Sequence, residues 1–294
     1  MHRATPFNPR EIRLAILAIC AGVALLVVND AGAKLLTDRY APIQILFLRN
    51  LIAVPVIAGI ITLIIGASAL RTRQPSLHAL RGVIMLAAVW LNFTGLSYLP
   101  LAEATALIFS APLFITALSV PLLRESVGWR RWSAVLLGFA GVLVIVRPGG
   151  ETFQLASLLP IGAALIYAVF MISARWIERG ESFWTMMLFT MLFPMIYAAP
   201  IALAVWTPIL PEDLWLFLAI AVSGSLGLAL VGQAFRWAPA SLVAPFDYTA
   251  LIWAVGLGWM LWGDKPIVWT ILGAIIIAIS GIFIMLREAP GPSG

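Results

Sequence analysis

Long apolar runs dominate the chain, and apolar and polar positions do not alternate within them. Charged residues and clusters of Pro, Gly and Asn divide the sequence into ten such runs. They cover residues 13–33, 42–66, 79–97, 101–123, 130–147, 155–176, 183–206, 213–235, 239–262 and 266–287. A membrane-spanning helix needs about 20 mostly apolar residues. Because continuous runs exclude a β-barrel, the pattern predicts an all-α membrane protein with ten transmembrane helices.

The composition supports this class of protein and removes others. Of the 294 residues, 62% are apolar and 11% are charged, whereas a soluble domain carries about 25% charged residues. The short loops leave no soluble domain for an active site, and nucleic acid is not an expected partner. Cys20 is the single cysteine, and the two histidines, His2 and His78, fall outside the apolar runs. We therefore expect no disulfide, no metal site and no cofactor.

The basic residues are distributed unequally between the two sides of the predicted bundle. The side of the termini carries Arg3, Arg10, Arg13, Arg71, Arg73, Arg81, Arg124, Arg130, Arg131, Arg175, Arg179, Arg236 and Arg287, and the opposite side carries Lys34, Arg39, Arg147 and Lys265. Cytoplasmic loops are enriched in Lys and Arg. The distribution of 13 against 4 predicts a multi-pass protein with both termini in the cytoplasm.

The two halves of the chain resemble each other at a shift of about 140 residues. The matched pairs are Pro100 with Pro239, Glu125 with Asp264, Trp129 with Trp269, Gly141 with Gly281, Arg147 with Arg287, and Gly22, Ala24 and Leu25 with Gly162, Ala164 and Leu165. We expect an N-terminal repeat over 1–148 and a C-terminal repeat over 149–294. Since each holds five helices, the second enters the membrane inverted relative to the first, which favours a binding site between the halves and alternating access.

The ends of the two repeats carry a recognisable motif. In the first repeat, Gly128-Trp129-Arg130-Arg131-Trp132 precedes Leu137-Gly138-Phe139-Ala140-Gly141 and Arg147-Pro148-Gly149. In the second repeat, Gly263-Asp264-Lys265-Pro266 precedes Leu272-Gly273-Ala274 and Ser280-Gly281. These segments resemble the drug/metabolite transporter superfamily and its EamA family. The resemblance implies ten helices in two repeats, in a secondary transporter rather than an enzyme.

The resemblance leaves two substrate classes and two directions open. The first is the YddG type, which exports aromatic amino acids and related amphipathic metabolites from the bacterial inner membrane; this is the main expectation. The second follows from residues 245–250, Pro-Phe-Asp-Tyr-Thr-Ala, which resemble uptake carriers for riboflavin or S-adenosylmethionine. In both cases the partners are a small molecule and the lipid bilayer, and we expect a monomer.

Polar residues inside spans are costly, so each is a candidate for the binding site. Asp247 precedes a helical stripe of small residues at Ala250, Ala254 and Gly258, so it faces protein, either in a cavity or bonded to a neighbouring helix. Asn29 follows Ala18 and Gly22 in the same manner. Asp30 is either a cavity group or a hydrated acid near the end of its helix.

Further polar candidates lie in other spans. Arg49 either extends its side chain to the interface or pairs with Asp30 or a substrate carboxylate. Asn92 and Gln233 fall at nearly equivalent repeat positions and serve either a zwitterionic substrate or helix packing. Glu103 follows Pro100 and is interpreted as a helix-start residue rather than a ligand.

Aromatic residues and prolines deep in spans complete the set. An aromatic substrate would stack on such side chains, with core packing as the alternative. The candidates are Trp90, Tyr167, Phe170, Tyr248 and Trp253.

Pro112 and Pro245 fall in the fourth and ninth runs, where each would remove a backbone hydrogen bond and bend the helix, as a gating hinge or a static kink. A remote alternative is an intramembrane aspartyl enzyme using Asp30 and Asp247.

Overall fold

The computed structural model describes residues 9–124, 128–147, 154–174, 181–238 and 243–288, and within these ranges it is entirely helical. The helices are α1 (Pro9–Leu36), α2 (Pro42–Ile64), η1 (Ala67–Leu70), α3 (Pro75–Leu96), α4 (Leu101–Ile108), α5 (Ala111–Leu123), α6 (Trp129–Val146), η2 (Leu155–Ser157), α7 (Leu158–Ser173), α8 (Phe183–Ala204), η4 (Pro211–Asp213), α9 (Leu214–Trp237), η5 (Ala244–Thr249), α11 (Ala250–Trp262) and α12 (Val268–Glu288). Each of the ten predicted spans corresponds to one or more of these helices, and α4 with α5 and η5 with α11 form one span each. Residues 175–176 and 239–242, at the ends of two predicted spans, lie outside the described residues.

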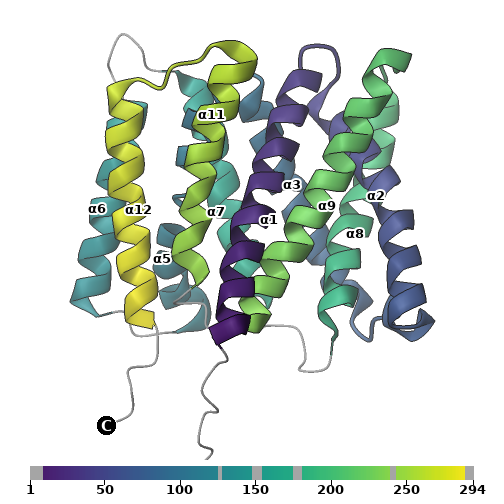
Figure 1. The fold of residues 1–294 in the computed structure, drawn as a ribbon, viewed down its shortest axis with the longest axis horizontal. Helices are drawn as coiled ribbons and strands as arrows, with labels where there is room; N and C mark the ends of the chain where they lie inside the picture. The colour runs from purple at the N-terminus through teal and green to yellow at the C-terminus, as the bar shows by residue number, and fades with distance from the viewer. Residues whose placement is uncertain (1–8, 125–127, 148–153, 175–180, 239–242, 289–294) are drawn as a thin grey trace, which may run out of the picture.

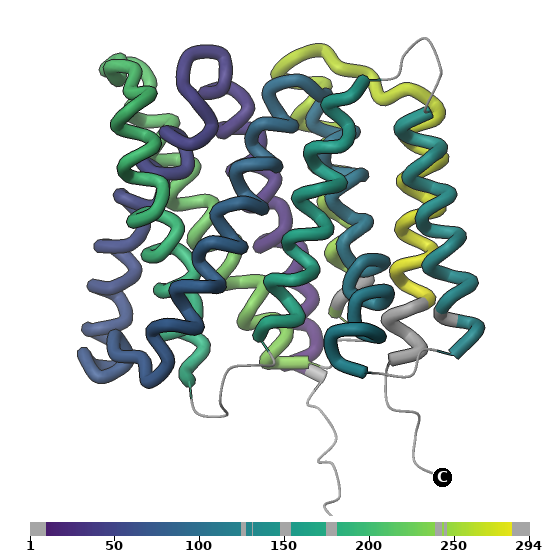
Figure 2. Tube along the Cα trace, turned by 180° about the vertical axis from the view of Figure 1, so that it is seen from behind, coloured from purple at the N-terminus to yellow at the C-terminus, as the bar shows by residue number. Residues whose placement is uncertain are grey.

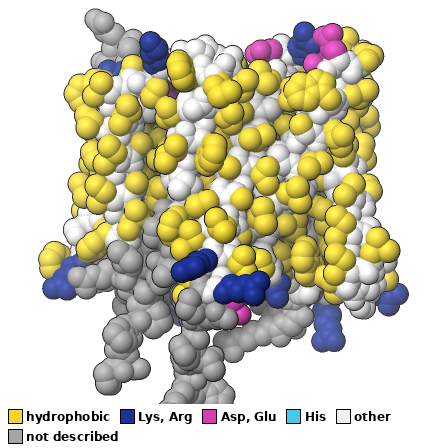
Figure 3. Space-filling view, viewed as in Figure 1, with side chains coloured by type: hydrophobic (Ala, Val, Ile, Leu, Met, Phe, Trp, Pro, Cys, Tyr) yellow, Lys and Arg dark blue, Asp and Glu magenta, His cyan; other side chains and the backbone are white. Residues whose placement is uncertain are grey.

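The helices form a bundle of roughly parallel rods two layers deep, with α12, α11, α1 and α9 in front of α6, α5, α7, α3 and α8 in the view of Figure 1, and the face seen in Figure 3 is largely apolar between its two ends. Seven of the described helices are long and apolar enough to cross a membrane, and α6 and α12 contain shorter apolar segments. On the face in Figure 3, Lys and Arg gather at the end where α1 begins, and Asp and Glu lie mainly at the other end. We call these the near end and the far end.

The two halves have equivalent packing and opposite direction. The α1 helix rises from the near end, whereas α7, the first long helix of the second half, descends from the far end (Figures 1 and 2). The pairing of α1 with α9 is matched by that of α7 with α3, and the pairing of α11 with α1 by that of α5 with α7. The α2–α8, α4–α11 and α6–α12 pairs join equivalent spans. This exchange of neighbours is what a two-fold relation between five-helix halves produces.

Glycines allow two of these pairs to approach closely. A Cβ at Gly22 of α1 would lie 2.9 Å from the carbonyl oxygen of Gly227 in α9, and a Cβ at Gly141 of α6 would lie 2.9 Å from that of Gly273 in α12. Lipid gives little hydrophobic drive to helix association, so close van der Waals packing of small residues holds such helices together. Both crossings join the first half to the second.

The fourth span is broken and the ninth contains a 3-10 segment, where the sequence predicted bends. Pro112 lies in the first turn of α5, after a break at Phe109 and Ser110. Proline is favoured there because the first-turn N–H has no partner within the helix. Pro245 lies in the first turn of the 3-10 segment η5, before α11. Pro112 therefore does not lie in a helix interior as expected, but follows an interruption of its span. Pro245 lies in a 3-10 segment between Val243 and α11, and residues 239–242 lie outside the described residues.

Adding one methyl group tests the α1–α9 crossing. We expect Gly227→Ala to destabilise the protein by about 1–3 kcal/mol, because the methyl would overlap the Gly22 backbone. Gly256→Ala is the control, since no atom lies within 4 Å of its Cβ position. Thermal unfolding in detergent measures both. Equal melting temperatures for the two variants would contradict the assigned role of the crossing.

Candidate functional site

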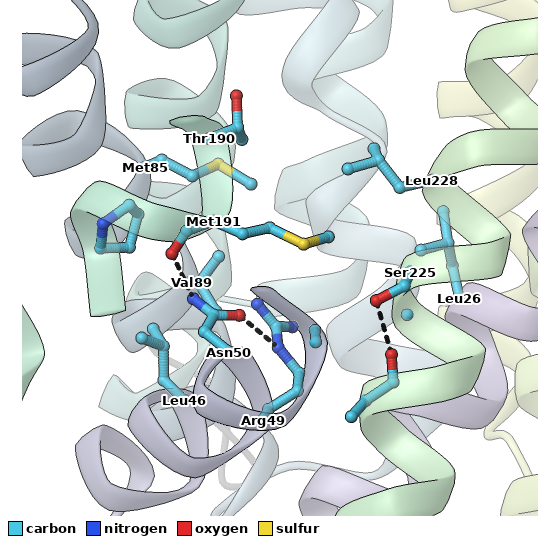
Figure 4. A pocket seen from close by; sticks show the side chains of 14 residues that line it. Leu26, Leu46, Arg49, Asn50, Met85, Val89, Thr190, Met191, Ser225 and Leu228 are labelled. Carbon is cyan, nitrogen blue, oxygen red and sulfur yellow. Dashed lines mark hydrogen bonds between the residues drawn. The ribbon is translucent and has the colours of Figure 1, made fainter. Parts of the chain in front are cut away.

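A small pocket lies between α2, α3, α8 and α9, where polar side chains enter an otherwise apolar interior (Figure 4). Its volume is about 80 Å³. We name it the Arg49 pocket, and it is lined by Leu26, Leu46, Arg49, Asn50, Ala53, Met85, Val89, Thr190, Met191, Pro194, Ala221, Gly224, Ser225 and Leu228. Both halves of the chain contribute to it.

The Arg49 side chain lies within the bundle and lines this pocket. Its Nε donates to Asn50 Oδ1 at 3.2 Å, and its Nη1 donates to Asn29 Oδ1 at 3.5 Å. Its guanidinium carbon lies 5.4 Å from the centre of the Phe93 ring, a cation–π distance. The sequence left open whether the Arg49 side chain extends to the membrane interface or pairs with a carboxylate inside the bundle. The structure shows it held by interior groups.

Asp30 supplies the opposite charge beside Arg49. Asn29 Nδ2 donates to Asp30 Oδ1 at 3.0 Å, and the Asn92 side chain also hydrogen-bonds Asp30. Arg49 acts on the same carboxylate through its charge. Asn29, Asp30 and Asn92, three of the predicted site residues, are therefore brought together around Arg49 from α1, α2 and α3.

The second half completes this network from α8 and α9. Asn50 Nδ2 donates to the Met191 carbonyl oxygen at 3.2 Å, as Figure 4 shows. A Cβ at Gly224 would lie 2.7 Å from Asn29 Oδ1, so only glycine leaves room for that amide. The polar network thus bridges the halves, and it presents the Arg49 guanidinium and the Asn50 amide to the pocket, with Asp30 beside Arg49 but outside the lining.

An apolar groove adjoins the Arg49 pocket between α2, α8 and α9. It measures about 260 Å³ and shares Ala53, Ala221 and Ser225 with the pocket. Ile57, Trp184 and Met187 are among its other lining residues. We call it the lateral groove. The two spaces together place a broad apolar surface beside a concentrated polar group.

A second set of predicted residues lies elsewhere, around η5. Asp247 acts electrostatically on Tyr167 and Tyr248. The Tyr248 ring lies 5.0 Å from that of Phe109 at the α4–α5 break, and its hydroxyl packs against Gly281 of α12. Tyr248 is buried, and neither Tyr248 nor Asp247 lines the Arg49 pocket. Of the predicted stripe, Ala250, Ala254 and Gly258 are buried, as expected.

Four other predicted site residues are not at the Arg49 pocket. Trp90 and Trp253 are 44% and 48% exposed, so they face the bilayer rather than a cavity; Trp90 is two positions from Asn92 and thus on the opposite face of α3. Gln233 accepts a hydrogen bond from Arg236 at the near end. Phe170 is buried beneath the Arg81 guanidinium, 4.2 Å from the ring centre.

The sequence interpretation missed several residues of the pocket. Asn50 follows Arg49 directly, and its position as an uncharged amide inside a span was the available signal. Ser225 lies within α9 beside Gly224 and Gly227, and a serine in such a segment is ordinary in a transmembrane helix. Thr190 and Met191 gave no signal, because a threonine and a methionine are ordinary residues in any transmembrane helix.

Polar contacts join the halves at the far end of the bundle. Tyr40 OH donates to Asp213 Oδ2 at 2.7 Å and accepts from the Leu210 N–H at 3.0 Å. Gln44 exchanges two hydrogen bonds with the Thr207 backbone, at 2.7 and 2.9 Å. Burial, together with the neighbouring Asp213, raises the pKa of Tyr40, so its hydroxyl keeps the donated proton. We call this set the far-end latch.

A corresponding set closes the near end. Glu181, just before α8, accepts from the Thr72 hydroxyl at 2.6 Å and from the Arg73 N–H at 2.9 Å. His78 Nε2 lies 3.8 Å from Glu181 Oε2. Burial acts to raise the pKa of Glu181, but these donors and His78 hold it below its ordinary value of 4.5. We call this set the near-end latch.

Each half of the chain resembles the same family of known proteins. The model of the EamA-like transporter family matches residues 13–147 and again residues 154–287, one match for each half. The chain belongs to the EamA-like transporter family. The family membership predicted from the two repeat endings is thereby confirmed, together with the all-α membrane class.

Named relatives of this family member transport different solutes. A riboflavin transporter of Vibrio cholerae is 33% identical over 283 residues, which cover 93% of each chain. An S-adenosylmethionine uptake transporter of Rickettsia bellii is 30% identical over 261 residues, 88% of this chain and 89% of that one. A pseudopaline exporter of Pseudomonas aeruginosa is 25% identical over 272 residues, 91% and 94% of the two chains.

A solved crystal structure shares the fold of this EamA-like transporter. It is 21% identical, with a TM-score of 0.64, over 94% of this chain and 99% of that one. At this identity the likeness concerns the fold alone.

Removing the Arg49 charge tests the polar network. We expect Arg49→Gln to cost about 3–5 kcal/mol of stability, because it leaves the Asp30 carboxylate without its cation. The double variant with Asp30→Asn should recover part of that loss. Arg236→Gln, at an exposed arginine, is the matched control. A double variant whose loss equals the sum of the single losses would show that the two side chains are not coupled.

Proposed function

We propose that this EamA-like transporter is a secondary carrier of the bacterial inner membrane that takes up a large, partly planar metabolite of the riboflavin class. The observation that carries the proposal is the Arg49 pocket with its adjoining lateral groove. A flat heterocycle would lie on the apolar lining, and its carbonyl and hydroxyl groups would accept hydrogen bonds from Arg49 and Asn50. The identity to the riboflavin transporter over 93% of each chain supports this choice.

The relatives favour uptake of a larger metabolite over export of an aromatic amino acid. The residues expected to stack an aromatic amino acid give that main expectation little support, since Trp90 and Trp253 face the bilayer. In contrast, the names of the first relatives agree with the alternative drawn from residues 245–250. The proposed activity is transport and not catalysis, in line with the expectation that the protein is not an enzyme.

S-adenosylmethionine is the second candidate, because the site contains charges of both signs. Asp30 would attract its cationic groups, and Arg49 would attract its carboxylate. However, Asp30 already receives bonds from Asn29 and Asn92 and lies beside Arg49. Its charge is therefore largely compensated, so a neutral substrate is the first choice.

The size of the pocket supports a transport cycle with moving halves. Sites for drug-sized ligands measure roughly 300–1,000 Å³, well above the volume of the Arg49 pocket. A substrate must therefore widen it. We infer that the repeats, 1–148 and 149–294, form an inverted pair that rocks about the pocket and gives alternating access. In this cycle the structure is the closed form, because both latches are made.

The irregular segments at Pro112 and Pro245 are the natural positions for local movement. Pro112 begins α5 after the turn at Phe109 and Ser110, and Pro245 lies in the 3-10 segment before α11, so a change at either place need not disrupt helix hydrogen bonds within α5 or α11. Pro112→Ala is accordingly expected to slow transport more than it weakens binding. The basic near end is assigned to the cytoplasm, which puts both termini there.

Transport in reconstituted vesicles decides the substrate. We expect saturable entry of radiolabelled riboflavin, and an increase in KM of about tenfold or more for Arg49→Lys, which keeps the charge but loses the planar donor fork. Arg236→Lys is the control and should behave as the unmodified protein. S-adenosylmethionine and tryptophan are measured in both directions in parallel. Saturable tryptophan efflux without riboflavin uptake would overturn the proposal in favour of the exporter.

Labelling of a cysteine in the pocket tests the latches. In a Cys20→Ser background, Thr190→Cys is treated with a membrane-impermeant thiol reagent from either side. We expect Glu181→Gln to increase labelling from the near end, since the neutral amide attracts the Thr72, Arg73 and His78 donors less strongly. Tyr40→Phe should increase labelling from the far end.

The near-end latch should also respond to acid. Because the pKa of Glu181 is depressed, its contribution to closure is complete above pH 4.5 and is lost as the pH falls below that value. Near-end labelling, divided by far-end labelling of the same cysteine at the same pH to correct for the falling thiolate fraction, should therefore be flat between pH 8 and about 5 and should rise only in stronger acid. A rise that is also present in Glu181→Gln would assign the response to another group.

A further inference from the structure

A second cavity lies at the far end of the bundle and shares no lining residue with the Arg49 pocket. It measures about 220 Å³ and lies where α4, α6, α11 and α12 meet. The residues used below are Glu103, Arg147, Asp264 and Lys265. We call it the far-end cavity. It plays no part in the substrate site proposed above.

Two acidic and two basic side chains line this cavity, and each half of the chain contributes one of each sign. Glu103 and Arg147 come from the first half, and Asp264 and Lys265 come from the second. No hydrogen bond or salt bridge joins these four side chains to one another within the described part of the chain. Charges of both signs therefore surround the cavity without neutralising one another by direct contact.

Arg147 is the side chain that most clearly lacks a partner. It ends α6 in the left-handed conformation, with φ 46°, and its guanidinium carbon lies 6.0 Å from the centre of the Trp269 ring. Its buried Nε has no hydrogen-bond partner among the described residues. An unsatisfied buried donor is unfavourable, and a carboxylate is the acceptor that suits a guanidinium best.

The acidic side chains are positioned across the same cavity. Glu103 accepts one hydrogen bond, from Ser157 Oγ at 3.2 Å, and is attracted by Arg147. A carboxylate accepts several bonds, so Glu103 retains free capacity. Gly263 ends α11 with φ 70°, and the next N–H, of Asp264, donates to the Gly258 carbonyl oxygen at 3.2 Å. This turn holds Asp264 at the cavity rim.

We propose that the far-end cavity binds a small zwitterion that carries a carboxylate and an ammonium group, as an α-amino acid does. The carboxylate lies against Arg147, and the ammonium lies between Glu103 and Asp264. Because the ligand contacts both halves, its binding favours the arrangement in which the far end is closed. A zwitterionic lipid headgroup has related chemistry, with a phosphate in place of the carboxylate.

Equilibrium binding to the full chain in nanodiscs tests the proposal. The probe is radiolabelled L-methionine, compared with its methyl ester, which keeps the ammonium alone, and with 4-(methylsulfanyl)butanoate, which keeps the carboxylate alone. We expect saturable binding of methionine that is about tenfold or more tighter than that of either analogue, because each lacks one charge-assisted contact. Equal binding of all three compounds, or no saturable binding, would overturn the proposal.

Variants then locate the site. Arg147→Asn removes the guanidinium but keeps a residue that tolerates the left-handed conformation, and Asp264→Asn removes one acid without changing its size. Each should weaken methionine binding by about tenfold. Arg236→Gln, at an exposed arginine of the near end, is the control and should leave it unchanged. Methionine binding that is insensitive to both cavity variants would contradict the assignment.

Two further measurements distinguish a free amino acid from a lipid headgroup as the ligand, and the far-end cavity from the Arg49 pocket as the binding site. Nanodiscs with and without phosphatidylethanolamine show whether a headgroup competes for the cavity; competition that Arg147→Asn abolishes would support the same chemistry with lipid as the source. Arg49→Lys should impair riboflavin transport but leave methionine binding intact. If Arg49→Lys weakens methionine binding and Asp264→Asn does not, methionine binds in the Arg49 pocket and the far-end proposal fails.

Discussion

The close crossing of α1 and α9 is the contact on which the rest of the structure depends. In a bilayer the apolar side chains gain little by leaving lipid, so close backbone approach, together with hydrogen bonds between helices, holds the two halves together. Gly22 and Gly227 provide that approach, and Gly141 and Gly273 repeat it between α6 and α12. The Asn29 amide then fits against Gly224, two turns further along α1 from Gly22. The polar network at Arg49 is thus a consequence of the glycine contact.

The network in turn makes a charged residue tolerable inside the membrane. A lone arginine there would be costly, and it is retained where it finds partners. Arg49 has the Asn29 and Asn50 amides, the Phe93 ring and the charge of Asp30. Since Asn50 also bonds the Met191 carbonyl of the second half, separating the halves would loosen the surroundings of the charge. This gives the proposed rocking movement a direct effect on the substrate site.

The sequence predicted the spans well and the cavity only in part. All ten spans agree with the structure because each is marked by its length and by polar residues at its ends. Asn29, Asp30 and Asn92 were predicted to face protein because they are polar groups inside spans, and the structure places them around Arg49 without making them part of the pocket lining. The aromatic candidates failed for a physical reason: in a helix that is apolar all round, hydrophobicity does not distinguish the lipid face from the interior. Trp90 and Phe93 are equally apolar, yet Trp90 faces lipid and Phe93 covers Arg49.

The sequence also predicted the local structure at Pro112 and Pro245 only in part. Proline in an apolar run indicates a bend or a start, and packing decides between them. The Phe109 ring at the break before Pro112 meets Tyr248 of η5, so the two spans contact each other. The observed break therefore reflects a contact between residues far apart in the chain, which no local pattern contains.

The two latches occupy corresponding places but use different chemistry, and this difference bears on which opening is favoured at rest. The far-end latch pairs the Tyr40 phenol with the Asp213 carboxylate and adds the Gln44 amide, whereas the near-end latch joins the Glu181 carboxylate to Thr72 and Arg73 and lies beside His78. In a symmetric pair of halves, geometry alone would make both openings equally easy. In the proposed cycle, unlike side chains at the two ends make one opening easier than the other, while the net direction of a secondary carrier follows the gradients of its substrate and of any coupled ion. The chemistry of the two latches would therefore set which opening is favoured at rest, and not the direction of net transport.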